Sequence, residues 1–173
     1  MLRKLALVVA AVTGLALTTA FTASAAACET GWGSLPRFAP ATTAGELTDI
    51  RGGRQDCYDR LVFDFRGTDD GYSVQYVDEV YEEGSGKVVP LRGGAKLQVV
   101  VYSPAYDASG HPTYVFANRR ELVDVSTYST FRQVAFAGSF EGQTTVGLGT
   151  RARLPFRVFT LPGRVVVDVA HTW

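Results

Sequence analysis

The sequence contains little of what most enzymes use for chemistry. Its 173 residues include only two histidines, two cysteines and one methionine, and the formal net charge is zero. A zinc hydrolase needs two or three histidine ligands near one another, whereas His111 and His171 are far apart in the chain. Without an excess of lysine and arginine, an electrostatic grip on nucleic acid is not expected. Eighteen glycines and seven prolines argue against a helical bundle.

The N-terminal residues have the organisation of a secretory signal peptide. Arg3 and Lys4 precede an uncharged stretch over residues 5–28, and small residues fill positions 23–27. A basic start, an apolar middle and an Ala-x-Ala site predict cleavage of residues 1–27 and export. A retained membrane anchor is the alternative, because the apolar run is nearly long enough to span a bilayer. We expect no membrane span after cleavage, since no later apolar run has a comparable length.

The two cysteines predict a disulfide between Cys28 and Cys57, because exported chains form such bonds. The bond would close a loop of about thirty residues and stabilise the fold by roughly 3–4 kcal/mol in the chain-entropy model. Lipid attachment at Cys28 is the alternative. Such sites usually have a large aliphatic residue three positions before the cysteine, where this chain has Ala25. Lipidation would also leave Cys57 as a free thiol.

The rest of the chain predicts an irregular lead-in over residues 28–56 and one all-β domain over residues 57–173. In residues 60–66, Leu61, Phe63 and Phe65 recur with a period of two and share one face, which is typical of a strand. Only residues 43–50 could form two helical turns. Many short strands between turn residues favour a two-sheet β-sandwich over a closed barrel. The expected strands are residues 60–66, 72–77, 96–102, 121–125, 131–136, 143–148, 156–161 and 164–170.

One sequence pattern occurs twice in the predicted strands. Residues 60–65 and residues 164–169 share the order Arg, three apolar residues, Asp, apolar residue. Arg60 and Asp64 are four residues apart on an extended chain, about 13 Å, and cannot pair with each other. Each could instead meet an opposite charge on a neighbouring strand. The repeat indicates either two strands built alike or a two-sheet domain with pseudo-symmetry.

The repeated pattern also carries a family resemblance. The closing hairpin over residues 156–169 resembles the end of AMIN domains, in which a strand, a turn with proline and an Arg-apolar-Val-apolar-Asp strand recur. Most of the remaining chain from Cys57 to Trp173 resembles the AMIN-like domains of exported actinobacterial proteins. The segments that carry this second resemblance are residues 57–60, 90–95, 131–135 and 138–149.

The resemblance implies a β-sandwich without catalytic activity of its own. AMIN domains localise cell-wall amidases and secretion components by binding peptidoglycan. An amidase domain usually follows in that family, whereas this sequence ends at Trp173, so we expect a stand-alone module. No ligand-contacting residues are transferred, because the matching motif is a core strand.

Tests for catalytic motifs favour a non-enzyme. The segment Gly138-Ser139-Phe140-Glu141-Gly142 has its serine one place too early for a nucleophile elbow. It is better explained as a turn made flexible by glycine. Acidic pairs at residues 69–70, 78–79 and 82–83 are expected to be solvated surface, since glycosidases need two carboxylates that face each other across a cleft. We expect no metal site and no cofactor.

A recognition site is instead predicted in the longest polar and aromatic loop, which follows residue 102. Loops of this kind on rigid sandwiches often carry recognition. Tyrosine rings offer flat faces for sugars, and paired arginines suit the carboxylates of a wall peptide. An ordinary surface loop, whose tyrosines cover the edge of the core, is the competing interpretation. The predicted ligand-binding residues are Tyr106, His111, Tyr114, Arg119 and Arg120.

Together these observations predict a secreted or cell-wall-associated, non-catalytic module that binds a cell-wall polymer, with peptidoglycan as the expected ligand. One alternative is a docking module that binds an envelope protein along an exposed sheet edge. An unrecognised hydrolase is the third possibility. Nucleic acid is not an expected partner, because cleavage of the signal peptide would leave acidic residues in slight excess.

Overall fold

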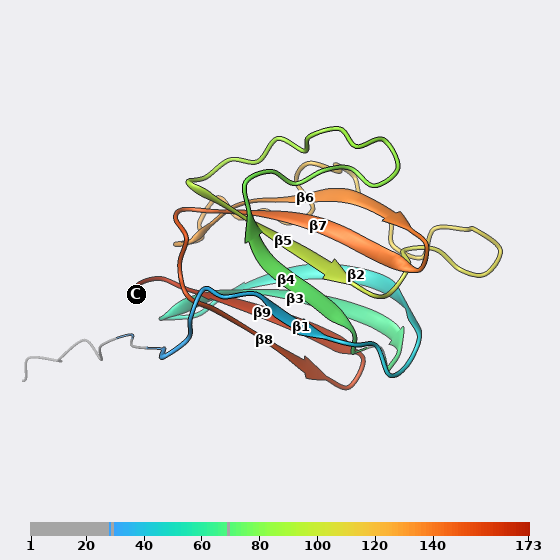
Figure 1. Ribbon diagram of the computed structural model, residues 1–173, viewed down its shortest axis with the longest axis horizontal. Coiled ribbons are helices and arrows are strands. Elements are labelled where there is room, and N and C mark those ends of the chain that lie inside the picture. Colours follow the sequence, from blue (N-terminus) through green and yellow to red (C-terminus); the bar gives the residue numbers. More distant parts are fainter. Residues whose placement is uncertain (1–27, 29, 69) are drawn as a thin grey trace, which may run out of the picture.

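The structure is a computed structural model that describes residue 28, residues 30–68 and residues 70–173. Two antiparallel sheets lie face to face (Figure 1). In sheet order, the five-stranded sheet contains β1 (Arg37–Ala39), β4 (Tyr72–Val77), β5 (Ala95–Val101), β7 (Gln143–Thr150) and β6 (Phe131–Phe140). The four-stranded sheet contains β2 (Gly45–Arg54), β3 (Tyr58–Gly67), β9 (Arg164–Ala170) and β8 (Phe156–Leu161). The prediction of an all-β, two-sheet sandwich is confirmed.

The core lies between the two sheets and follows the alternation of the sequence. Leu61, Phe63 and Phe65 of β3 all point into it, as their period of two predicts. From the opposite sheet, β5 contributes Leu97 and Val99, both fully buried. The described part of the chain contains no helix, and therefore no helix long and apolar enough to cross a membrane. The predicted signal peptide, residues 1–27, lies outside the described residues.

The lead-in departs from the sequence prediction. Residues 28–56 are not irregular throughout, and residues 43–50 form no helical turn, because Gly45–Arg54 is strand β2. Its register with β3 shifts between Leu47 and Asp49, which marks a β-bulge. The bulge lets Leu47 and Ile50 both face the core, although they are three residues apart. In an unbroken strand they would lie on opposite faces, so their spacing imitates a helix.

Residues 121–125 also differ from the prediction, because they form no strand. They belong to an irregular segment beside the edge strand β6. The Leu122 N–H donates to the Val134 carbonyl at 2.9 Å, and the Phe136 N–H donates to the Arg119 carbonyl at 2.7 Å. These bonds partly satisfy the outer edge of β6, which reduces its ability to pair with another chain.

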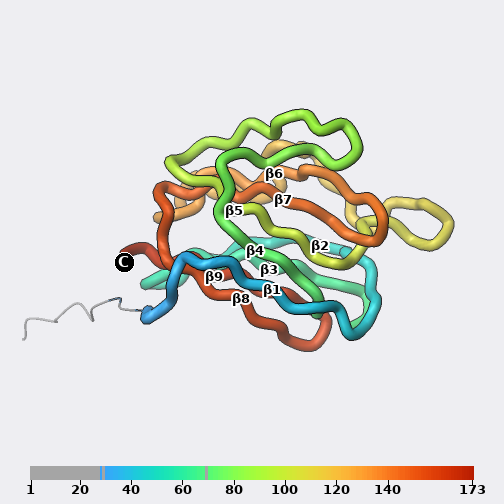
Figure 2. Tube along the Cα trace, viewed as in Figure 1, coloured from blue at the N-terminus to red at the C-terminus, as the bar shows by residue number. Residues whose placement is uncertain are grey.

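A third layer covers part of the outer face of the five-stranded sheet. The segment between β4 and β5, residues 78–94, crosses the outside of β6 and β7 and lies above them in Figure 2. Val80 and Val89 pack there against Ala135 and Ala137 in a small second core. The segment can approach closely because β7 carries glycines, and a Cβ on Gly149 would meet the Arg92 carbonyl oxygen at 2.0 Å. The outer face of β4 and β5 is left less covered.

The close approach at Gly149 predicts the effect of one added methyl group. Gly149→Ala would force the backbone at Arg92 away from the sheet, and overpacking of this kind costs about 1–3 kcal/mol. We expect chemical denaturation to show a loss of that size in the free energy of unfolding. Gly53→Ala is the control, because the nearest atom to its Cβ, Gln55 Nε2, is 3.7 Å away. Equal losses in the two variants would contradict the packing role of Gly149.

Cys28 and Cys57 form a disulfide, with their Cα atoms 5.2 Å apart. The bond ties the chain before β1 to the start of β3. Trp32, in the same leading segment, packs edge-on against Tyr58 with ring centroids 5.5 Å apart. The prediction of a disulfide is therefore confirmed, and the bond ties the lead-in to the sandwich.

Loss of this disulfide should destabilise the protein measurably. Cys57→Ser releases a loop with a sequence separation of 29 residues, and removal of a native disulfide typically costs about 2–5 kcal/mol. We expect a lower denaturation midpoint for the variant, and a similar midpoint for the reduced wild-type protein. Two alkylatable thiols or a lipid-sized mass on Cys28 in the intact protein would contradict the assignment.

The two strands with the repeated pattern are direct neighbours. β3 pairs with β9 so that Arg60 lies opposite Asp168 and Asp64 lies opposite Arg164. Both strands carry arginine and aspartate in the same order along the chain. Because the strands run in opposite directions, the arginine of each strand lies opposite the aspartate of the other. Arg60 Nε donates to Asp168 Oδ1 at 2.7 Å, and Arg164 Nε donates to Asp64 Oδ1 at 2.9 Å. The expectation that each charge meets its opposite on a neighbouring strand is confirmed.

Candidate functional site

The five residues predicted to bind a ligand do not form one cluster. Tyr106 and His111 belong to a loop beyond β5 that projects from one end of the sandwich (yellow in Figure 1). The loop is held by Asp107, whose carboxylate accepts hydrogen bonds from the N–H groups of His111 and Ser109. These bonds lower the pKa of Asp107. His111 is exposed at the loop, with its Nδ1 atom 3.4 Å from an Asp107 carboxylate oxygen.

Tyr114 is a core residue, which corrects its assignment as a ligand contact. Only 6% of its surface is exposed, and its ring packs 5.5 Å from that of Phe116. Burial raises the pKa of its hydroxyl to about 12. A buried ring offers no face to a sugar, so here the competing interpretation, a tyrosine that covers the core, is the better one.

The two arginines lie beside β6 rather than in the loop. Arg119 Nη2 is 3.2 Å from Glu82 Oε1. Arg120 is exposed and borders a different hollow, together with Leu91 and Gln133. Thus Arg119 and Arg120, although adjacent in sequence, do not form one paired cationic site with the tyrosines.

A groove runs over the uncovered part of the five-stranded sheet, and we name it the β4–β5 groove. Its volume is about 420 Å³. The strands β4, β5 and β7 contribute its floor, the segment between β4 and β5 contributes one wall, and Tyr102 follows β5 directly. The groove is lined by Ser73, Tyr81, Glu82, Glu83, Gln98, Val100, Tyr102, Gln143 and Thr145.

Two exposed aromatic rings flank the β4–β5 groove. Tyr81 is 52% exposed on the wall. Phe38 of β1 lies opposite Ser73 in the register, and opposite residues of antiparallel strands share a face. Phe38 therefore lies on the same face as the groove floor, and it is 77% exposed. The groove thus has a polar floor between two rings.

Glu83 gives the groove an unsatisfied acceptor. Its Oε1 atom accepts hydrogen bonds from the Thr145 hydroxyl and, at 3.2 Å, from Gln143 Nε2. Its Oε2 atom is buried and has no hydrogen-bond partner among the described residues. The prediction that residues 82–83 are simply solvated surface is wrong for Glu83, because the close approach of its segment to β6 and β7 brings it onto the sheet.

A second hollow adjoins the β4–β5 groove on the other side of Tyr102. Its volume is about 500 Å³, and Tyr106, Arg66 and Glu46 contribute to its lining. Tyr102 lines both spaces, and the adjacent residues Gly142 and Gln143 line one each. The two spaces therefore meet at Tyr102, and one extended ligand could contact both. Tyr106 is the predicted binding residue that the structure brings to this surface.

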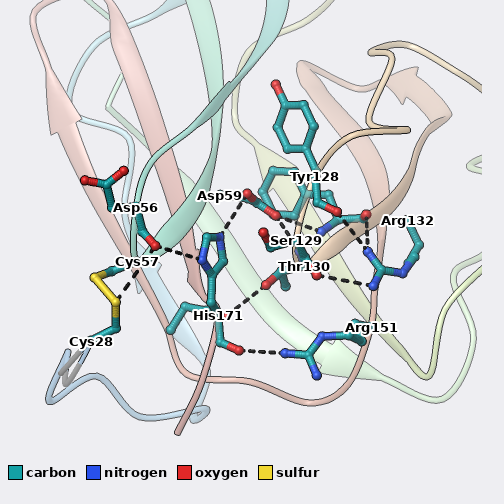
Figure 3. A network of polar contacts seen from close by, with 12 residues as sticks. Cys28, Asp56, Cys57, Asp59, Tyr128, Ser129, Thr130, Arg132, Arg151 and His171 are labelled. Atoms are coloured by element: carbon teal, nitrogen blue, oxygen red, sulfur yellow. Dashed lines mark hydrogen bonds and ion pairs between the residues drawn. A yellow bond between two sulfur atoms is a disulfide. The ribbon is translucent and has the colours of Figure 1, made fainter. Parts of the chain in front are cut away.

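A buried polar network at the other end of the sandwich surrounds Asp59 and His171 (Figure 3). Asp59 Oδ2 accepts hydrogen bonds from the N–H groups of Thr130 at 2.5 Å and Phe131 at 3.1 Å. Its Oδ1 atom is 3.1 Å from His171 Nε2, and the Asp56 carbonyl oxygen is 3.2 Å from His171 Nδ1. Both ring nitrogens of His171 are therefore engaged within the protein, which leaves neither to activate a nucleophile.

Ser139 is likewise held by structural contacts. Its hydroxyl oxygen accepts from the Ala105 N–H at 2.8 Å and lies 2.9 Å from Thr144 Oγ1 and 3.1 Å from the Gln143 carbonyl oxygen. The serine joins the β6–β7 hairpin to the loop after β5. Among the described residues no three His, Cys, Asp or Glu side chains gather in a way that could hold a metal ion.

The Asp59 network should contribute to stability through its buried N–H groups. Asp59→Ala removes the acceptor of the Thr130 and Phe131 N–H groups, and each buried donor left unpaired costs about 1–3 kcal/mol. We expect a loss of about 2–5 kcal/mol in the free energy of unfolding. Asp56→Ala is the matched control, because Asp56 is exposed and contacts His171 only through its carbonyl oxygen. A loss no larger than that of the control would show that the network is dispensable.

The comparison with protein families agrees with this architecture. The family model described as the AMIN-like domain matches residues 45–171. The match begins at the first residue of β2 and ends one residue after β9, so it spans the whole four-stranded sheet. No curated protein and no solved structure gives a match. The family match covers well over half of the chain, and the protein belongs to the AMIN-like domain family.

Proposed function

We propose that this AMIN-like domain is an exported, non-catalytic module that binds peptidoglycan in the β4–β5 groove. The observation that carries the proposal is a polar floor flanked by the exposed rings of Phe38 and Tyr81. Sugar rings present apolar faces that pack on aromatic side chains, and their hydroxyls donate to carboxylate and amide oxygens. The groove supplies both kinds of contact.

The shape of the surface also suits a polymer. The β4–β5 groove and the hollow beside Tyr106 meet at Tyr102, so successive units of a glycan strand can occupy successive spaces. Both spaces are open rather than enclosed, as access for a long insoluble ligand requires. The disulfide and the family membership fit a protein outside the cytoplasm.

The test is cosedimentation of the purified protein with peptidoglycan from which covalently attached polymers have been removed. Phe38→Ala/Tyr81→Ala removes both flanking rings, and we expect binding to fall at least tenfold, about 1.4 kcal/mol. The melting temperature should change little, since both side chains are more than half exposed.

Val115→Ala/Trp173→Ala is the matched control for this experiment. It removes two side chains that are 81% and 71% exposed and do not line the groove. Unchanged binding by the groove variant, or an equal loss in both variants, would reject the groove as the site. Failure of the wild-type protein to sediment with peptidoglycan would reject the proposed function itself.

Docking of an envelope protein is the second candidate function, and the edge strand β8 favours it. β8 pairs with β9 on one side. On its other side, the described main-chain contact is a single hydrogen bond from the Phe156 N–H to the Gly33 carbonyl oxygen at 2.9 Å. Thr160 and Leu161 are exposed, so an extended segment of a partner could add to this edge. Binding to peptidoglycan without any other protein separates the two functions.

A further inference from the structure

The outer face of the four-stranded sheet carries more arginines than its carboxylates can neutralise. Asp64 accepts two hydrogen bonds from Arg51, to Oδ2 at 2.6 Å and to Oδ1 at 3.1 Å. It accepts a third, at 2.9 Å, from Arg164 Nε. Burial by itself would raise the pKa of Asp64, but the hydrogen bonds from Arg51 and Arg164 outweigh it and lower that pKa. One carboxylate therefore lies between two guanidinium groups.

The same arrangement occurs around Asp168, which is fully buried. Arg60 donates to it twice, to Oδ1 at 2.7 Å and to Oδ2 at 2.9 Å. Arg157 donates once, from Nε to Oδ2 at 2.8 Å. We name this set of four arginines and two aspartates the arginine face. Arginine stays protonated in proteins, so each of these two aspartates with its two arginines carries one excess positive charge. Asp49, which lies opposite Asp64 in the register, also attracts Arg51 and offsets part of the excess at that end.

Two arginines of the arginine face have N–H donors available for a ligand. Arg157 and Arg164 each use only Nε in a hydrogen bond, and the described part of the chain provides no acceptor for their Nη atoms. Arg157 is 41% exposed and Arg164 is 48% exposed in their side chains. Their Nη groups can therefore reach an oxyanion from solvent, and a guanidinium matches two such oxygens with parallel N–H bonds.

Aromatic rings hold part of the arginine face in place. The guanidinium carbon of Arg157 lies 4.4 Å from the ring centroid of Trp32 and 5.1 Å from that of Phe159. The guanidinium carbon of Arg60 lies 5.3 Å from the ring centroid of Tyr58. Stacked and ion-paired guanidinium groups have little conformational freedom left to lose when an anion binds.

The spacing of the two excess charges suits a chain rather than a small molecule. Asp64 and the partner of Asp168, Arg60, are four residues apart on β3, so the two positions are about 13 Å apart along the strand. Both lie on one open sheet face. A phosphodiester polymer carries its charges in the chain itself, and an extended polymer lying flat on the face can reach both positions. Carboxylates at the tips of side chains stand away from their backbone and fit this face less well.

We propose that the arginine face binds a phosphodiester polymer of the cell envelope, at a site separate from the β4–β5 groove. The two excess charges on β3, β8 and β9 neutralise phosphates of the polymer. Trp32 and Phe159 pack against the organic part of its chain. This binding does not depend on the peptidoglycan-binding function proposed above, because the two sites lie on the outer faces of different sheets.

The probe for this proposal is poly(glycerol phosphate), with poly-L-glutamate as the carboxylate counterpart. Arg157→Gln/Arg164→Gln removes both excess charges, while Arg51 and Arg60 still neutralise Asp64 and Asp168. We expect affinity for poly(glycerol phosphate), measured by calorimetry, to fall at least tenfold. The remaining binding should depend less on salt, because fewer charges are screened. Sedimentation with phosphate-free peptidoglycan should not change.

Arg37→Gln/Lys87→Gln is the matched control, since it removes the same charge from two exposed side chains outside the arginine face. An equal loss of affinity in this control would show that the binding is non-specific electrostatic attraction, and would overturn the proposal. Binding of poly-L-glutamate as tightly as poly(glycerol phosphate), or no binding of either, would overturn it as well. If the double variant unfolds, Arg164→Gln alone decides, because Arg164 makes one hydrogen bond and Asp64 keeps both from Arg51.

Discussion

The pairing of β3 with β9 is the contact on which the sandwich depends. It joins residues that are 100 or more positions apart in sequence, and it places β9 between β3 and β8 in the four-stranded sheet. On the inner face, Leu61 lies opposite Val167, and both are fully buried. On the outer face, the reciprocal Arg–Asp pairs fix the register, because a slip of one residue would bring every charge into the core. Burial and charge therefore specify the same alignment.

The two outer faces of the sandwich differ in chemistry, since they are built from different residue types. The four-stranded sheet carries charged side chains in cross-strand contact. The five-stranded sheet carries glycines on β7, which admit a covering segment, and polar side chains on β4 and β5, which line a groove. One domain of this size can thus present two unrelated surfaces without any change in its core.

Much of the fold follows from local sequence pattern. Alternation identified most of the strands correctly, and the cysteine pair predicted the disulfide. Strand β2 was not predicted, because its bulge breaks the alternation at Leu47 and gives its core residues a spacing of three. Residues 121–125 were wrongly predicted as a strand. They are rich in apolar residues, but they bond to β6 through isolated main-chain contacts rather than a ladder.

The candidate site was less predictable than the fold. The loop near Tyr106 was selected for its aromatic residues, and the same residues also allowed a tyrosine that covers the core. The structure shows that Tyr114 takes this second role. The β4–β5 groove joins residues from three strands and a covering segment, and only the sheet order brings them together. The glycines of β7 were the one sequence signal for the covering segment. A strand without side chains on one face leaves room for another segment to pack closely there.

The position of β9 also determines when the domain can fold during synthesis. β9 is the last strand of the described residues in sequence order, yet it occupies an interior position in its sheet. Until β9 has left the ribosome, β8 has no strand partner and β3 exposes one edge together with its apolar face. The four-stranded sheet therefore forms only after β9 has been synthesised, and the earlier strands stay accessible to chaperones until then.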